Sequence, residues 1–351
     1  MRSSRVLGAA TALTLALALT ACGESGSSDE ADAEAGGTEG SSDGAAEGAF
    51  PVTVQHAFGE TTIEEQPERV ASVAWANHEV PLALGIVPVG MSEATWGDDD
   101  DNGVLPWVED ALAEMDAETP VLFDETDGID FEAVADTEPD VILAAYSGLT
   151  QEEYDTLSQI APVVAYPELA WGTTWQQMIE LNSQALGLAE DGDALVEELE
   201  GYVSDTVADY PALEGKSAMF SSHSTDDLSQ VGFYTTHDPR ALFFEELGMT
   251  TPELVSERSA ESETFYETVS AENADLLADV DVLVTYGDDA LLTELQDNAL
   301  VSEIPAVADG AVVMLENDTP LAAAANPSPL AIEWGLTDFL DLVSAAAEKS
   351  R

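Results

Sequence analysis

The chain has 351 residues, of which 8 are Lys or Arg and 71 are Asp or Glu, so its formal net charge is −63. This length allows two domains with hydrophobic cores, and the 45% of hydrophobic residues excludes disorder throughout the chain. Nucleic acid is an unsuitable partner because phosphate binding needs clustered Lys and Arg, and so acidic a surface predicts a salt-tolerant source organism.

Residues 1–22 have the pattern of a lipoprotein signal peptide. Arg2 and Arg5 precede an apolar stretch that is too short for a membrane span, and Leu19-Thr20-Ala21-Cys22-Gly23 resembles the bacterial lipobox. The alternative is an ordinary cleavage site with an incidental cysteine. We expect Cys22 to be lipidated, which would anchor the protein outside the cytoplasm on the outer face of the cytoplasmic membrane.

Two further conclusions follow from the amino-terminal region. Cys22 is the single cysteine of the chain, which excludes an intrachain disulfide and any multi-cysteine metal site. Residues 23–49 consist mainly of Gly, Ser and acidic residues, with no aromatic and no basic residue. Such a composition cannot form a core, so this segment is predicted to be a disordered acidic tether.

The globular part begins near residue 50. Alternating residues in 51–63 predict a β-hairpin. Apolar runs of strand length then recur, separated mostly by segments of helical period, at residues 70–75, 86–91, 141–145, 163–166, 217–221, 281–286 and 311–315. Short apolar strands that alternate with helices predict α/β architecture with buried, parallel-rich sheets.

An internal similarity suggests that this architecture occurs twice. Asp140–Tyr146 is echoed by Asp281–Tyr286, and Leu157–Val163 is echoed by Val301–Val307. The sequence around Gly85 also has a counterpart around Gly248, where glycine suits a left-handed helix end. Chance likeness between apolar strands is the alternative. Three matches in the same order favour two Rossmann-like lobes, at residues 50–172 and 189–351.

Residues 173–188 are predicted to form the connecting helix. Thr173-Thr174-Trp175-Gln176 has the pattern of a capping box, and Gly187 is expected to end the helix. A single helix between two lobes leaves a cleft, and ligands of parallel α/β sheets bind at the carboxyl ends of strands. Tyr146 and Tyr286 fall at such ends.

A known family shares an ordered set of short segments with this chain over about residues 50–345. These segments are Gln66–Val73, Asn77-His78-Glu79, Leu82–Gly90, Glu138–Ile142, Ile160–Val163, the Trp175 helix and Ser328-Pro329-Leu330. No one of them is diagnostic, but together they resemble the substrate-binding lipoproteins of iron-siderophore ABC importers.

This resemblance implies two α/β lobes joined by one long helix, with a ferric siderophore held in the cleft and delivered to an ABC permease. We expect a monomer without catalytic activity or a cofactor of its own, since iron arrives within the ligand. One acidic residue on each lobe would dock onto the permease. Glu272 matches on the second lobe; on the first, Gln151 occupies the strict alignment and Glu153 is the candidate, beside Glu152. A solvated surface role is the alternative for each glutamate.

A ferric siderophore needs a shaped pocket, aromatic faces and a few polar groups. Candidates of these types follow the predicted strands or lie in the long segment before the helix that precedes Gly248. They are Trp75, Asn77, His78, Trp96, Tyr146, Ser147, His223, Tyr234, Arg240 and Tyr286. Simple core packing is the alternative for each single aromatic residue, whereas the group as a whole favours binding.

Arg240 is one of only four basic residues between residues 50 and 345. It would pair either with an anionic ligand or with nearby Asp238 or Glu245. Catecholate and citrate complexes need several cationic partners, which this sequence does not offer, so a neutral or cationic hydroxamate complex is favoured.

Other readings remain open. Haem or cobalamin would suit the same architecture. His78, His223 and His237 would suit a zinc or manganese ion if they converged across the cleft, although His56 sits in the hairpin. Asp98–Glu109 matches calcium-loop spacing but lacks the preceding helix, so it is interpreted as a solvated acidic loop. An extracellular hydrolase is the least favoured, since G-x-S-x-G and H-E-x-x-H are absent.

Overall fold

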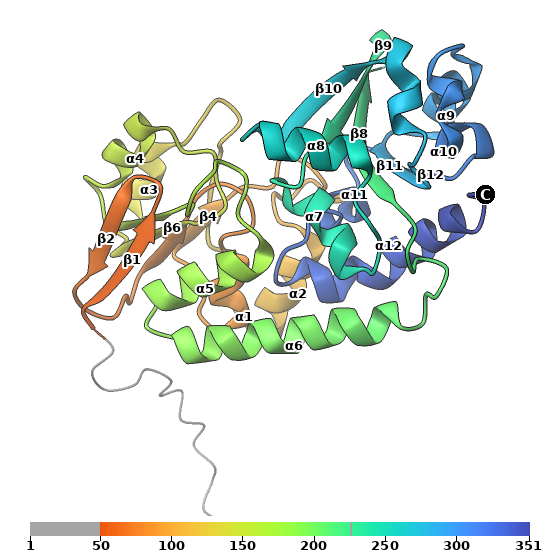
Figure 1. The fold of residues 1–351 in the computed structure, drawn as a ribbon. Helices are drawn as coiled ribbons and strands as arrows, with labels where there is room; N and C mark the ends of the chain where they lie inside the picture. The colour runs from red at the N-terminus through yellow and green to blue at the C-terminus, as the bar shows by residue number, and fades with distance from the viewer. Residues whose placement is uncertain (1–49, 225–226) are drawn as a thin grey trace, which may run out of the picture. The chain divides into compact units, whose positions relative to one another are not determined.

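The computed structural model describes residues 50–224 and 227–351, which contain two five-stranded sheets with helices packed around them (Figure 1). The predicted signal peptide, Cys22 and the tether lie outside the described residues. No helix within the described ranges is both long enough and apolar enough to cross a membrane. The predicted hairpin is confirmed: β1 (Val52–His56) pairs with β2 (Gly59–Ile63) in antiparallel register.

The first sheet is entirely parallel. Its strands, in spatial order, are β5 (Val121–Phe123), β4 (Gly90–Ser92), β3 (Val70–Ser72), β6 (Val141–Ala144) and β7 (Val163–Ala165). The helices that accompany it are α1 (Glu79–Ala83), α2 (Pro106–Glu114), α3 (Phe131–Asp136) and α4 (Gln151–Leu157). All residues of β3, β6 and β7 are buried, as their near-continuous apolar sequences predict.

The second sheet repeats this strand order but is mixed. Its strands, in spatial order, are β10 (Tyr266–Ser270), β9 (Asp227–Tyr234), β8 (Ala218–Ser224), β11 (Val282–Tyr286) and β12 (Val312–Leu315). β8, β11 and β12 are parallel, whereas β9 and β10 pair antiparallel. In both sheets the strand that comes first in the chain, β3 or β8, is central, and the echoed segments at Asp140 and Asp281 lead into β6 and β11, which occupy equivalent places. The predicted α/β class with two parallel-rich sheets is therefore confirmed.

The remaining helices surround the second sheet or join the two sheets. They are α5 (Trp175–Ala185), α6 (Ala189–Val207), α7 (Pro239–Glu246), α8 (Glu253–Glu261), η1 (Ala271–Leu277), α9 (Asp289–Asp297), η2 (Val301–Glu303), α10 (Pro305–Asp309), α11 (Pro320–Ala324) and α12 (Ala331–Ala347). Gly85 and Gly248 follow α1 and α7 with positive φ of 77° and 76°, as expected of left-handed helix ends.

Two consecutive helices occupy the connection between the sheets. α5 begins at a capping box in which Thr174 and Gln177 bond reciprocally, one residue later than the sequence pattern suggested. It ends before Gly187, which has a φ of +73° and packs so closely against the Phe50 ring that a side chain would not fit. α6 then continues the connection. The lobe boundaries at residues 172 and 188 remain predictions.

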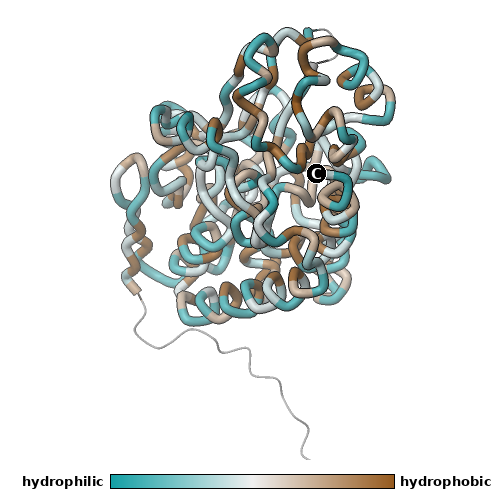
Figure 2. Tube along the Cα trace, turned by 45° about the vertical axis from the view of Figure 1, so that its right-hand side comes forward, coloured by the Kyte–Doolittle hydropathy of each residue, from teal (hydrophilic) through white to brown (hydrophobic). Residues whose placement is uncertain are grey.

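The buried faces of α5 and α6 share one hydrophobic core with residues of β8 and α12. Trp175 and Ile179 of α5, Leu199 of α6 and Leu340 of α12 share one hydrophobic cluster with Phe220 of β8. Figure 2 shows hydrophobic residues along the strands and on the inner turns of helices, with hydrophilic residues on loops and outer turns. α6 contacts both α5 and α12, so it spans the region between the sheets (Figure 1).

Two helices near the carboxyl terminus, α11 and α12, pack against helices of the first sheet. Ala323 of α11 and Ala331 of α12 pack with Leu82 of α1 and residues of α2. Glu79 is fully buried there and accepts hydrogen bonds from the Trp107 indole, at 2.7 Å, and from the Leu330 amide, at 2.9 Å. Burial raises the pKa of Glu79, while these hydrogen bonds act in the opposite direction. The carboxylate also lies at the amino end of α12, where negative charge is favourable.

The two faces of α12 provide a test of this packing. Leu340 is 0% exposed and Leu342 is 39% exposed on the same helix. Leu340→Ala is expected to lower the free energy of unfolding by about 2–5 kcal/mol because it leaves a cavity, whereas Leu342→Ala should cost less than about 1 kcal/mol. Urea unfolding measures both. Equal losses would contradict the assigned buried face.

Candidate functional site

The loop between β3 and α1 presents Trp75 at the carboxyl edge of the first sheet. Ala74 and Ala76 both adopt the left-handed region, with φ of 59° and 61°. A non-glycine residue in this region is strained, so the surrounding structure must hold the loop. Glu125 provides one such contact, since its carboxylate accepts from the Ala74 amide at 2.9 and 3.2 Å. Trp75 itself is half-buried and lines two pockets.

Asn77 fixes this loop to the neighbouring strand. Its side-chain amide donates to the Val73 and Tyr146 carbonyls, both at 2.9 Å, and its Oδ1 accepts from the Tyr146 amide at 3.0 Å. Asn182 of α5 donates to the same oxygen. Asn77 is 0% exposed, so the structure places this predicted ligand residue beneath the site, where it positions Trp75 and Tyr146.

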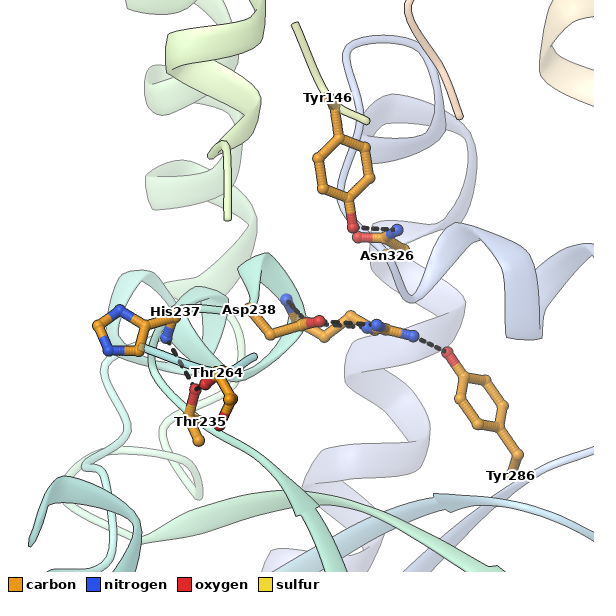
Figure 3. Close-up of polar contacts among 8 residues, drawn as sticks. Tyr146, Thr235, His237, Asp238, Thr264, Tyr286 and Asn326 are labelled. Atoms are coloured by element: carbon orange, nitrogen blue, oxygen red, sulfur yellow. Dashed lines mark hydrogen bonds and ion pairs between the residues drawn. The ribbon is translucent and has the colours of Figure 1, made fainter. Parts of the chain in front are cut away.

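Tyr146 follows β6 and points towards the carboxyl-terminal part of the chain. Its hydroxyl accepts a hydrogen bond from Asn326 at 3.1 Å (Figure 3). Its ring meets Trp171 edge to face, with the centroids 5.4 Å apart. Burial raises the pKa of Tyr146, so its hydroxyl stays protonated. Ser147, the next residue, is fully buried and donates to the Ala144 carbonyl, while also lining the pocket described below.

A second set of candidates lies at the carboxyl edge of the second sheet. Arg240 bonds Asp238 through two nitrogens, at 2.8 and 2.7 Å, and donates from Nη1 to the Tyr286 hydroxyl at 3.3 Å. Figure 3 shows Asp238 and Tyr286 at the two ends of this row. The guanidinium lies 3.9 Å from the Tyr234 ring centroid, which is cation–π geometry.

The charge of Arg240 is balanced within the protein. Burial would lower the pKa of Arg240, but the hydrogen bonds and the charge of Asp238 outweigh burial and raise it. Of the two alternatives left open by the sequence, the structure therefore contains the ion pair with Asp238. This set accordingly presents aromatic faces and a neutral polar pair.

Trp96 joins the two sets of aromatic residues. Its ring meets Tyr286 edge to face with the centroids 5.4 Å apart, and the centroids of the Trp96 and Trp75 rings are 6.4 Å apart. Asp318 accepts from the adjacent Gly97 amide at 2.8 Å. Trp75, Trp96 and Tyr286 therefore form a continuous aromatic row, which includes residues from both sheets.

Pockets open on both sides of this row. One of about 350 Å³ lies against the first sheet, and its walls include Trp75, Ser147, Trp171 and three glutamates. The other, of about 460 Å³, lies against the second sheet and is lined by His223, Tyr286, Gly287, Asp288, Leu291, Glu316 and Asn317. Both volumes are in the range of small-molecule sites.

Glu125 is the most perturbed carboxyl group of the first pocket. Burial raises its pKa to about 7, with the charge of Glu153 acting in the same direction, while hydrogen bonds from Ala74 and Ser92 oppose the shift. The group is therefore part protonated and part ionised near neutral pH.

The four histidines do not form a metal site. Burial lowers the pKa values of His78 and His223 to about 4, so both are neutral at pH 7. His237 places Nε2 2.9 Å from two carbonyl oxygens, those of Ser259 and Ser262. His56 bonds Thr61 in the hairpin. Within residues 50–224 and 227–351, no group of three His, Cys, Asp or Glu residues is arranged to hold a metal ion.

The sequence that matches calcium-loop spacing is a surface turn in which carboxylates bond nearby backbone amides. Asp98 accepts from the amides of Asp100 and Gly103, and Asp100 accepts from that of Asn102. The interpretation as an acidic loop fits this arrangement.

The two predicted docking residues differ in their surroundings. Glu272 is exposed at the start of η1. Glu153 is half-buried, lines the first pocket and accepts from the Thr150 amide and hydroxyl, both at 2.8 Å, as part of the α4 capping box. Glu152 is the exposed carboxylate of the same turn.

Three residues of the site were missed by the sequence reasoning. Trp171 turns the chain with a φ of +60°, and its ring lies so close to Gly148 that no side chain would fit there. Asn326 and Glu125 contact the site from segments far from the predicted strand ends. A tryptophan in the turn before the connecting helix was the one available signal, whereas the other two are placed by tertiary packing.

Comparisons with known proteins agree with this geometry. The family model described as periplasmic binding protein matches residues 70–319. The chain belongs to the periplasmic binding protein family. This family binds solutes and is not catalytic. This periplasmic binding protein shares its fold of two α/β sheets with solved relatives.

Among those relatives is PiaA of Streptococcus pneumoniae TIGR4 in complex with ferrichrome, with 43% identity, a TM-score of 0.83, and coverage of 86% of this chain and 100% of PiaA. A periplasmic solute binding protein from Mycobacterium smegmatis str. MC2 155 has 25% identity, a TM-score of 0.69, and coverage of 84% and 98%. The probable siderophore-binding lipoprotein YfiY of Bacillus subtilis (strain 168) is 27% identical over 75% of this chain and 78% of YfiY.

The raised pKa of Glu125 predicts a pH-dependent stability. The folded state holds this proton up to about pH 7, whereas the unfolded chain releases it near 4.5, so the free energy of unfolding falls as pH rises between these values. Glu125→Gln is expected to match the native protein near pH 4 and to be more stable by on the order of 1–3 kcal/mol at pH 8. Denaturant unfolding at the two pH values measures this difference, and a variant destabilised at pH 8 would contradict the account.

Proposed function

We propose that this protein captures a ferric siderophore of the hydroxamate type outside the cytoplasm and delivers it to an ABC importer. The observation that carries the proposal is the aromatic row of Trp75, Trp96 and Tyr286, flanked by pockets at the carboxyl edges of both sheets. A ferric siderophore has its iron coordination already filled, so the protein contributes faces and hydrogen bonds rather than metal ligands.

The balance of charge favours a hydroxamate complex. Arg240 is neutralised by Asp238, and the first pocket carries carboxylates. An anionic catecholate or citrate complex would meet repulsion there, whereas a neutral or cationic complex would not. The relative PiaA, whose structure contains ferrichrome, supports the same choice.

We infer that the ligand contacts Trp75, Trp96, Tyr146, Tyr234 and Tyr286. Ser147, His78 and His223 line the pockets, and Arg240 supports Tyr286 through its hydroxyl. Asn77 holds the first wall in place from beneath.

The membrane anchor is part of the proposal. Cys22 within the lipobox pattern would carry acyl chains, and the acidic tether would let the binding protein reach its permease. The relative YfiY, named a lipoprotein, supports this location.

The first prediction of the proposal concerns binding. Ferrichrome should quench the intrinsic tryptophan fluorescence saturably, and Trp75→Ala should weaken the affinity at least about tenfold because it removes one aromatic face. Trp334→Ala is the matched control, since it also removes one fluorophore but lies exposed on α12. Ferric enterobactin, haemin and cyanocobalamin serve as competing ligand classes. If any of these competitors, or free Zn²⁺, bound more tightly than ferrichrome, the proposed ligand class would be wrong.

The second prediction concerns the permease. We infer that Glu272 and the first turn of α4, with Glu152 and Glu153, dock onto basic residues of the permease. Glu272→Arg should leave ferrichrome affinity unchanged and reduce ferrichrome uptake in cells at least about tenfold, because a carboxylate that pairs with a cation becomes a repelling charge. Glu257→Arg, an exposed position on α8, is the control. Equal uptake by the two variants would show that Glu272 is not part of the docking surface.

A further inference from the structure

Three glutamates from different elements meet in the first pocket. Glu93 follows β4, Glu125 follows β5 and Glu153 belongs to α4, and all three line the same cavity of about 350 Å³. Each is half-buried. They are the ionisable residues among the described residues that line this pocket, so its charge is entirely negative.

A buried polar group without a partner lies next to this cluster. His78 is 7% exposed, and its Nδ1 has no hydrogen-bond partner among the described residues. It lines an annex of about 20 Å³ that shares Ala74, Trp75, Ser92 and Glu93 with the larger pocket. A space of this size holds a group as large as one water molecule or one ammonium. A buried imidazole nitrogen left unpaired is costly. In the tautomer that carries its proton on Nε2, His78 Nδ1 is an acceptor that an incoming N–H donor would satisfy.

We propose that this pocket makes the protein selective for ferric hydroxamate complexes that carry a pendant primary ammonium group, which Glu93, Glu125 and Glu153 bind beside His78. The inference rests on the proposed function and specifies the ligand class within it. An ammonium offers three N–H donors and one positive charge, which match several half-buried carboxylates. Besides forming these hydrogen bonds and ion pairs, the cation would reduce the electrostatic repulsion among the three glutamates.

The groups that face Glu125 determine the pH dependence of this selectivity. They are the Ala74 amide, Ser92, and the carboxylates of Glu93 and Glu153. His78 is neutral at pH 6 and above, since its pKa is about 4. Glu125, with a pKa of about 7, is mostly protonated at pH 6 and mostly ionised at pH 8. Selectivity for the cation is therefore expected to rise over this interval.

Ferrioxamine B and ferrioxamine E provide the test, because both are tris-hydroxamate ferric complexes but only the linear B form carries a free ammonium. Dissociation constants are measured by fluorescence quenching at pH 6 and pH 8 at fixed salt. Ferrioxamine B should bind about tenfold more tightly than ferrioxamine E at pH 8, with a smaller ratio at pH 6. Glu125→Gln and Glu93→Gln should each reduce the ratio at pH 8 at least threefold.

Glu198→Gln is the matched control, since it removes one carboxylate from an exposed site on α6 and makes the net charge less negative by the same amount. An unchanged ratio in this variant shows that the pocket, not the overall charge, selects the cation. Equal affinity for ferrioxamines B and E would overturn the inference while leaving the proposed function intact. Failure of ferrichrome and both ferrioxamines to bind would overturn the two together.

Discussion

The reciprocal hydrogen bonds between Asn77 and the backbone of Tyr146 are the constraint on which the site depends. They tie the loop after β3 to the end of β6 inside a fully buried environment, where an unmade hydrogen bond is costly. We call this pair of hydrogen bonds the Asn77 clamp. Ala74 and Ala76, beside Trp75, keep their left-handed backbone conformation because the Asn77 clamp and Glu125 hold the loop. At the second sheet the ion pair of Asp238 and Arg240 is a second clamp. It holds Tyr286 through a hydrogen bond and Tyr234 through a cation–π contact.

Both clamps serve a ligand that the protein does not need to coordinate. In the proposed binding mode the aromatic faces would provide apolar contact. The two sets of polar contacts hold these rings in place, so little side-chain entropy would be lost on binding. The charges follow the same logic. Arg240 is held by its own carboxylate partner, and the only ionisable residues among the described lining of the first pocket are glutamates, which disfavour the anionic siderophore classes. In a chain with a net charge of −63, we propose that a few half-buried carboxylates serve recognition, whereas most acidic residues of the described ranges are exposed to solvent.

The sequence predicted the parts of the fold that depend on local pattern. Continuous apolar runs identified β3, β6, β7, β8, β11 and β12, and the repeated segments placed β6 and β11 at equivalent positions. It missed β5, β9 and β10, because Val121 is exposed and the other two strands contain many polar residues and lie towards a sheet edge, where one-sided burial weakens the signal. The rule that ligands bind at strand ends selected Trp75, Tyr146 and Tyr286, which the structure places at the carboxyl edges of the two sheets. The sequence did not show that Asn77 is buried beneath the site, and it did not identify Asn326. The positions of both side chains depend on contacts with segments that are distant in the sequence.

The most direct test is the location of iron in a crystal of the protein with a bound ferric hydroxamate, determined from the anomalous scattering of the metal. We expect a single iron peak between the walls that carry Trp75 and Tyr286, with the siderophore oxygens as its ligands and the aromatic rings in contact with the complex. Iron at another surface, or iron coordinated directly by His78 or His223, would contradict this expectation.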